Sequence, residues 1–181
     1  MDLLVRLDEF QIKAIYGIMF GLNECHNISD EGLKALASHI DDNMTTLQSV
    51  LLDLASTQIT DGGFNDFMIL FSNNLKNLQY LELNLNTTVL SDDGLTNIGQ
   101  TICKNLQSLL QLHLYFARCS NISNKGVSNL SNLIGKNLKN LQSLKLVFSR
   151  TQVSDNGALN LGLAICNNLK NLHFLHLYFN S

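Results

Sequence analysis

The strongest constraint on the fold is an apolar triplet at alternate positions that recurs at a nearly fixed interval along the sequence. The triplets are Ile18-Phe20-Leu22, Val50-Leu52-Leu54, Leu81-Leu83-Leu85, Leu112-Leu114-Phe116, Leu144-Leu146-Phe148 and Leu175-Leu177-Phe179. Their first members are separated by 32, 31, 31, 32 and 31 residues. Alternating apolar and variable residues predict a strand with one buried face. A fixed period of this kind predicts a repeat array.

A second pattern follows each of the first five triplets and predicts the start of a helix. An apolar residue precedes Ser or Thr, then Asp or Asn, and a glycine comes two residues later: Ile28-Ser29-Asp30 with Gly32, Ile59-Thr60-Asp61 with Gly63, Leu90-Ser91-Asp92 with Gly94, Ile122-Ser123-Asn124 with Gly126, and Val153-Ser154-Asp155 with Gly157. A Ser or Thr N-cap stabilises a helix by about 1 kcal/mol, and an Asp in the first turn favours the helix dipole. Glycine lowers helix propensity, so its recurrence predicts helices that approach too closely there for a side chain.

The residues behind each glycine have helical spacing, as in Leu95, Ile98 and Ile102. An asparagine stands near each expected helix end, at Asn43, Asn74, Asn105, Asn137 and Asn168. Asparagine tolerates the left-handed conformation that ends many helices, so these residues are expected to be C-caps. A ladder of ligand-binding asparagines is the alternative. The predicted strands lie near residues 17–22, 49–54, 80–85, 111–116, 143–148 and 174–179, and the predicted helices near 30–42, 61–73, 92–104, 124–136 and 155–167.

The combined pattern, Asn-Leu-x-x-Leu-x-x-Leu-x-Leu-x-Phe followed by Ile-Ser-Asp-x-Gly-Leu, resembles the leucine-rich repeat, in particular its ribonuclease-inhibitor-like and cysteine-containing types. The phrase Asn-Leu-Lys-Asn-Leu-Gln at residues 74–79 and 137–142 also resembles the long repeat arrays of ciliated protists. The resemblance implies an α/β solenoid, or horseshoe, with a parallel sheet inside and helices outside. Curvature is also expected because parallel strands are about 4.8 Å apart whereas packed helices need about 8–10 Å. The period of 31 or 32 residues is longer than usual for such repeats, so each helix is expected to be longer by up to a turn.

The sequence contains no proline and no Gly/Ser-rich linker. The whole sequence, residues 1–181, is therefore expected to form one leucine-rich repeat domain with five full repeats. Residues 1–12 are expected to form a capping helix or a partial repeat. The sixth strand, 174–179, has no helix after it, so the chain is expected to be a fragment of a longer array or to dock its C-terminal end onto another chain. A net charge of −3 argues against a nucleic-acid or anionic membrane surface.

The cysteines and histidines predict neither a disulfide nor a metal site. Cys103 and Cys166 occupy one repeat position, and Cys25 and Cys119 another. These pairs are two and three repeats apart, beyond the roughly 7 Å between Cα atoms that a disulfide allows. Free thiols favour a reducing, cytoplasmic compartment. His173 and His176 are three apart on a predicted strand and so point to opposite faces.

Three columns of residues between the buried leucines are expected to line the concave face. They are Met19, Leu51, Glu82, His113, Lys145 and His176; Gly21, Asp53, Asn84, Tyr115, Val147 and Tyr178; and Asn23, Ala55, Asn86, Ala117, Ser149 and Asn180. Tyrosines beside cations are typical of interface hot spots, although ordinary sheet faces also carry such pairs. The residues expected to bind a partner are Asp53, Glu82, Asn84, His113, Tyr115, Lys145, Val147, His176 and Tyr178.

The protein is therefore expected to bind a protein partner, without catalysis and without a cofactor. A structural subunit of a larger assembly is a second form that this role can take. One alternative comes from Arg118 and Arg150, which occupy equivalent positions just past two strands. GTPase activators of the Ran type are leucine-rich repeat proteins that act through such loops, and an arginine can stabilise phosphoryl transfer. The alternative is thus a GTPase-activating or other regulatory subunit that acts through the Arg118/Arg150 loop.

Overall fold

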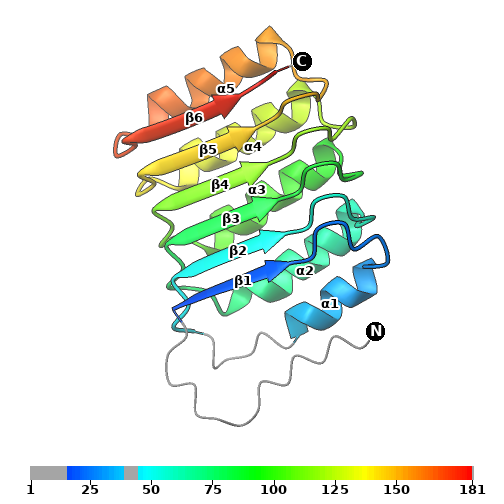
Figure 1. The fold of residues 1–181 in the computed structure, drawn as a ribbon. Helices are drawn as coiled ribbons and strands as arrows, with labels where there is room; N and C mark the ends of the chain where they lie inside the picture. The colour runs from blue at the N-terminus through cyan, green and yellow to red at the C-terminus, as the bar shows by residue number, and fades with distance from the viewer. Residues whose placement is uncertain (1–15, 39–44, 181) are drawn as a thin grey trace.

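The structure is a computed structural model that describes residues 16–38 and 45–180. Its elements alternate strictly between strand and helix, and Figure 1 shows the strands side by side in one layer with the helices stacked behind them. The sheet has the order β1-β2-β3-β4-β5-β6, and every neighbouring pair is parallel. The predicted strand–helix array is confirmed.

Each strand covers five residues and includes the first two members of its triplet. The strands are β1 (Gly17–Gly21), β2 (Ser49–Asp53), β3 (Tyr80–Asn84), β4 (Gln111–Tyr115), β5 (Ser143–Val147) and β6 (Phe174–Tyr178). Equivalent triplet members pair across the sheet, as Leu81 with Leu112 and then Leu144. The third member of each triplet follows directly after the strand and continues the buried row.

The helices are α1 (Asp30–Ser38), α2 (Asp61–Asn73), α3 (Asp92–Asn105), α4 (Asn124–Asn137) and α5 (Asp155–Asn168). The predicted bounds of the last four are correct to within one residue. Residues 39–42 of the first predicted helix, the predicted C-cap Asn43 and the predicted N-terminal helix at 1–12 lie outside the described residues.

One continuous apolar core fills the space between the sheet and the helices. Three phenylalanines of α2 stack in sequence, with ring centroids 5.8 Å apart for Phe64 and Phe67 and 5.0 Å apart for Phe67 and Phe71. A second stack crosses repeats, from Phe116 to Phe148 at 5.6 Å and on to Phe179 at 6.0 Å. The core thus passes from one repeat to the next, and each repeat is stabilised by its neighbours.

The predicted helix starts are confirmed, and a link between repeats accompanies them. The side chains of the N-caps Thr60, Ser91 and Ser123 each accept a hydrogen bond from a backbone N–H in the first turn. The aspartates that follow Ser29, Thr60 and Ser91 each reach to the next repeat. Asp92 accepts the backbone N–H of Ser123 at 2.7 Å and its hydroxyl at 2.6 Å. Asp30 and Asp61 do the same to the next repeat's N-cap, and the resulting row of carboxylates is called here the aspartate ladder.

The predicted reason for the recurring glycines is confirmed, and the neighbour is this ladder. A Cβ on Gly63 would lie 1.9 Å from the Asp30 side chain, and one on Gly126 would lie 2.4 Å from Oδ1 of Asp92. The glycine leaves the space that the carboxylate of the preceding repeat needs.

The predicted left-handed asparagine caps are wrong. Asn74 is a C-cap but has φ −100° and ψ −4°, whereas Asn105, Asn137 and Asn168 are the last helical residues. After these three the C-cap is a buried leucine with negative φ: Leu106, Leu138 or Leu169. Positive φ occurs instead after the strands, at Glu24, Ser56, Thr87, Arg118 and Arg150. The chain reverses from strand to helix there, so the left-handed residue belongs to that turn.

Candidate functional site

The surface of the sheet that faces away from the helices is called here the sheet face. Burial alternates along the strands, as in β3, where Leu81 and Leu83 are buried and Tyr80, Glu82 and Asn84 are half-buried. The strand register aligns the first two predicted columns across all six strands: Met19, Leu51, Glu82, His113, Lys145 and His176, and then Gly21, Asp53, Asn84, Tyr115, Val147 and Tyr178. The structure therefore brings the predicted binding residues onto one face.

The sequence reasoning missed a further column at the start of the strands. It consists of Gly17, Ser49, Tyr80, Gln111, Ser143 and Phe174. The signal was available, because each member stands two residues before a predicted column and has the same alternation. This column contributes the most exposed aromatic residue of β6, Phe174, whose exposed fraction is 63%.

A polar cluster joins three strands in the middle of the sheet face. The Tyr80 hydroxyl donates to Oε2 of Glu82, and the rings of Tyr80 and His113 meet edge to face at a centroid distance of 5.2 Å. Nδ1 of His113 lies 3.4 Å from Oε2 of Glu82, and its Nε2 lies 3.4 Å from the Ser143 hydroxyl. Burial, and then the Glu82 carboxylate, raise the pKa of Tyr80 above its ordinary value. The cluster thus holds Glu82 in contacts within the protein.

The order Ser143, His113, Glu82 is also the order of a nucleophile, a base and an orienting acid. Proton transfer within such a triad uses contacts of about 2.6–3.2 Å, whereas both contacts of His113 are 3.4 Å. The Glu82 carboxylate is moreover shared with Tyr80. The contacts join β3, β4 and β5 into one hydrogen-bonded cluster on the sheet face.

Lys145 lies between two tyrosines on the C-terminal side of that cluster. Its Nζ is 4.8 Å from the ring centroid of Tyr115 and 5.8 Å from that of Tyr178. Both distances are within cation–π range. A hydrogen bond with the Tyr115 side chain is the main cause that raises the pKa of Lys145. The structure thus places Lys145 beside half-buried Tyr115 and exposed Tyr178, which puts a positive charge on the sheet face.

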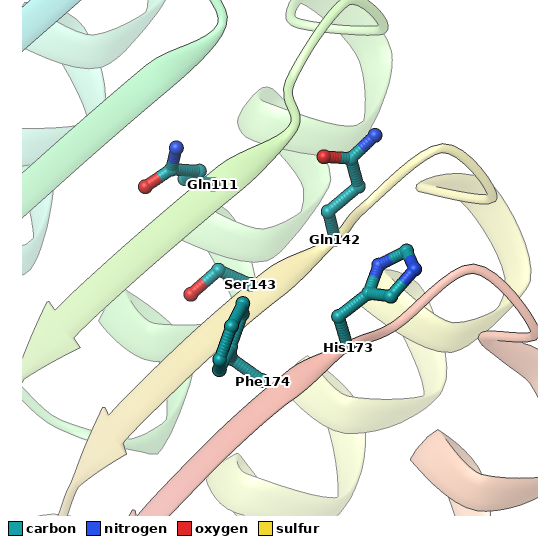
Figure 2. Close-up of a pocket in the computed structure, with 5 residues that line it drawn as sticks. All are labelled: Gln111, Gln142, Ser143, His173 and Phe174. Carbon is teal, nitrogen blue, oxygen red and sulfur yellow. The ribbon is translucent and has the colours of Figure 1, made fainter.

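A shallow hollow lies at the beginning of the last strands, and one of its lining residues, Ser143, stands two residues before Lys145 on β5. It has a volume of about 380 Å³ and is lined by Gln111, Gln142, Ser143, His173 and Phe174. Figure 2 shows Gln111, Ser143 and Phe174 on successive strands, with Gln142 and His173 immediately before β5 and β6. The lining combines amide groups, an imidazole and an exposed aromatic ring, which suits a mixed polar and apolar ligand group.

The other predicted binding residues are less distinctive. Asp53 accepts the backbone N–H of Ala55 at 3.1 Å, and Asn84 accepts that of Asn86 at 3.3 Å, so both stabilise the turns after their strands. Val147 is half-buried beside Tyr115 and Tyr178 in its column. His176 is exposed and pairs in register with Lys145.

The arginines of the alternative hypothesis, Arg118 and Arg150, are exposed in the turns after β4 and β5. Their φ angles are 62° and 58°, which they share with Glu24, Ser56 and Thr87 at equivalent positions. Their backbone N–H groups donate to Ser149 and Asn180 of the next turn at 2.8 and 2.7 Å. This conformation is therefore a property of every repeat and is independent of the arginine side chain.

All four cysteines lie within the described residues and are free thiols. Cys103 and Cys119 are buried, whereas Cys25 and Cys166 are exposed, so the thiols differ within each pair of equivalent positions. Burial raises the pKa of Cys103 to about 12 and also raises that of Cys119. Within residues 16–38 and 45–180, no three His, Cys, Asp or Glu side chains gather as a metal would require. None of the helices described is long and apolar enough to cross a membrane.

Comparison with known proteins supports the fold. No family model matches the sequence, and no curated protein matches it. The chain is similar to the solved structure of the leiomodin-1 actin-binding site 2 (ABS2), with a TM-score of 0.57, 18% sequence identity, and coverage of 83% of this chain and 79% of that chain. At this identity the likeness concerns the fold alone. Together with the 31- or 32-residue period and the six parallel strands alternating with five helices, it identifies the fold of this chain as an α/β leucine-rich repeat solenoid.

Proposed function

We propose that this protein is a non-catalytic interaction module that binds a protein partner through the sheet face. The observation that carries the proposal is Lys145, held between Tyr115 and Tyr178 on an open surface. Aromatic residues beside a cation are enriched among interface hot spots. The similar solved structure is an actin-binding site, which supports a protein partner for this fold without naming actin as the partner here.

The test is capture of partners from native lysate by the wild-type protein and by variants, followed by mass spectrometry. Tyr178→Ala and Tyr115→Ala remove sheet-face contacts, and Lys136→Ala changes an exposed residue of α4 as a control. We expect proteins that are captured by wild type and Lys136→Ala but lost with both tyrosine variants. Equal capture by all four proteins would contradict binding through the sheet face.

A second part of the proposal concerns the face formed by α5 and β6. A Cβ built on Gly99 of α3 would lie 3.0 Å from the side chains of Leu130 and Leu133. A Cβ built on the equivalent Gly162 of α5 would have no described heavy atom within 4 Å beyond its own stretch of helix. Cys103 is buried, whereas the equivalent Cys166 is exposed. Leu159 and Leu163 of α5 are 60% and 53% exposed, and Leu175, Leu177 and Phe179 are only half-buried.

These positions support packing of a further repeat, or of another chain, against α5 and β6, and hence a role in a larger assembly. Light scattering after size-exclusion chromatography, with hydrogen exchange of β6, tests it on the 181-residue chain. We expect self-association or weak protection of the β6 amides. A soluble monomer with strongly protected β6 amides would contradict this part.

The type of repeat and the compartment complete the proposal. The Leu-x-Leu and Ser-Asp-x-Gly phrases support the ribonuclease-inhibitor-like or cysteine-containing type of repeat, and four free thiols support a reducing cytoplasm. Activation of a GTPase by Arg118 and Arg150 has weaker support, because their backbone conformation is common to all repeats.

A further inference from the structure

Lys145 is a cation without a carboxylate partner in the part of the chain that the structure describes. The two ion pairs found there join His113 to Glu82 and Lys125 to Asp93. Two tyrosine rings hold the Lys145 ammonium in place. The ammonium has three donors, and the hydrogen bond with the Tyr115 side chain, which raises the pKa of Lys145, uses one of them.

The acid nearest in the same column is already engaged. Glu82 accepts from the Tyr80 hydroxyl and faces Nδ1 of His113 at 3.4 Å, with only about a fifth of each side chain of the Glu82–His113 pair exposed. His113 lies between Glu82 and Lys145 in the strand register, so Glu82 acts on Lys145 only by a longer-range attraction, the smallest of the causes that raise the pKa of Lys145. The position of Lys145 is therefore open to an acid from outside the protein.

An exposed aromatic side chain stands on the neighbouring strand, diagonally across from this cation in the register. Phe174 is 63% exposed and stands two residues before His176, which pairs with Lys145. The hollow of about 380 Å³ at Phe174 also presents the amide groups of Gln111 and Gln142, which can bind a peptide backbone.

We infer that the partner is an acidic protein segment that places a carboxylate on Lys145 and an adjacent aromatic or aliphatic side chain on Phe174 and its hollow. This inference rests on the proposed function and specifies the chemistry of the partner. The charge of Lys145 favours it, and His176 on the neighbouring strand adds an imidazole N–H that can donate to the same carboxylate. A phosphate group is commonly bound by several cations or by a helix N-terminus, and this part of the sheet face offers one lysine.

The test is selection of peptides from a random display library on the wild-type protein, with competition between variants. Peptides that bind the sheet face are those lost on Tyr178→Ala. We expect these peptides to share Asp or Glu next to an aromatic or aliphatic residue. Binding of the selected peptides to Lys145→Met, measured by fluorescence polarisation, should be weaker by about 30-fold or more, as for a hot-spot residue.

Three controls separate the inference from its alternatives. Lys145→Arg keeps the charge and should retain most of the affinity, whereas Lys136→Met removes a charge on α4 and should have no effect. Exchange of Asp and Glu for Asn and Gln in the selected peptides should weaken binding to wild type but not to Lys145→Met. Circular dichroism of each variant confirms that it is folded.

The possible failures are distinguishable. Peptides that depend on Tyr178 but lack acids, or bind Lys145→Met as well as wild type, would overturn the acidic partner and leave the proposed function standing. A selection that yields peptides unaffected by any sheet-face variant would overturn both. Synthetic phosphoserine versions of the selected peptides test the phosphate: if only these lose affinity on Lys145→Met, a phosphate replaces the carboxylate.

Discussion

The Asp61 carboxylate occupies the space that a side chain at Gly94 would need, since a Cβ on Gly94 would lie 2.1 Å from Oδ1 of Asp61. The same carboxylate accepts the backbone N–H of Ser91 at 2.9 Å. One short acid thus joins two repeats and determines that the third residue of the next helix is glycine. The relationship repeats along the aspartate ladder, so the ladder and the glycines form one device.

We predict that Gly126→Ala destabilises the protein whereas Gly162→Ala stabilises it. A Cβ on Gly126 would lie 2.4 Å from Oδ1 and 2.9 Å from Cα of Asp92, so the backbone itself must move. We expect a loss of about 1–3 kcal/mol in the free energy of unfolding, as for overpacked sites. At Gly162, where no described atom lies within 4 Å, alanine should add about 0.5–1 kcal/mol through helix propensity. Urea denaturation measures both, and equal effects of the two substitutions would contradict the steric role of Gly126.

A second prediction concerns the position at which the ladder carries asparagine. Nδ2 of Asn124 donates to the Ser154 hydroxyl at 2.8 Å, and Ser154, unlike Thr60, Ser91 and Ser123, makes no side-chain cap bond. A carboxylate there would accept from the hydroxyl and free its oxygen to cap α5. Asn124→Asp should therefore stabilise the protein at neutral pH by about 0.5–1 kcal/mol. Thermal denaturation checks it, and the part of the gain that comes from capping α5 should be lost in the background Ser154→Ala, so an equal gain in that background would contradict the capping role.

Much of the fold could be predicted from the sequence because its signals are local and repeated. The alternation of Leu81, Leu83 and Leu85 fixes both the strand and its buried face, and the constant period fixes the register. The glycines signalled a close approach between helices. They did not identify Asp30, Asp61 and Asp92 as the groups that approach, because that depends on the distance between stacked helices.

The errors concern features that local patterns do not determine. Asparagines were expected to be left-handed C-caps, but three of them are the last helical residues. The C-caps that follow are Leu106, Leu138 and Leu169, whose side chains are buried in the core. Left-handed residues occur after the strands at residues as different as Glu24 and Arg150, so composition carries no signal for them. On the sheet face the columns were predictable. The hydrogen bond from Tyr80 to Glu82 was not predicted. Strand alternation places both side chains on one face but does not show that the hydroxyl reaches the carboxylate.

The sheet face yields a third prediction, about affinity for the captured partner. Tyr115 and Tyr178 hold Lys145 between them. Tyr115 is half-buried, and the exposed fraction of Tyr178 is 44%. Replacing either by alanine should weaken binding by about 2 kcal/mol or more, the magnitude of a hot spot. Lys136→Ala on α4 should change affinity little. Isothermal titration calorimetry measures the difference, and comparable losses at both places would contradict the assignment of the sheet face.

The free thiols provide a fourth prediction, which tests the burial pattern directly. Cys25 and Cys166 are exposed, whereas Cys103 and Cys119 are buried. With a thiol reagent such as Ellman's reagent at pH 8, two thiols should react rapidly and two only as fast as the protein opens or unfolds. Cys166→Ala should remove one rapid equivalent and Cys103→Ala one slow equivalent. Rapid reaction of Cys103 would contradict the burial of its thiol.

The fifth prediction follows from the raised pKa values of the buried thiols. Burial raises the pKa of Cys103 to about 12 in the folded protein, whereas a thiol in an unfolded chain has a pKa of about 8.5. Between these values the unfolded chain has lost the proton and the folded protein retains it, so stability must fall as pH rises. The slope should reach at most about 1.4 kcal/mol per pH unit for each such thiol. Urea denaturation between about pH 8 and 9.5, below the ordinary titration of tyrosine and lysine, isolates this effect. Burial also raises the pKa of Cys119, so Cys103→Ala should reduce the slope of stability against pH without abolishing it. An unchanged slope in that variant would contradict the burial of the Cys103 thiol.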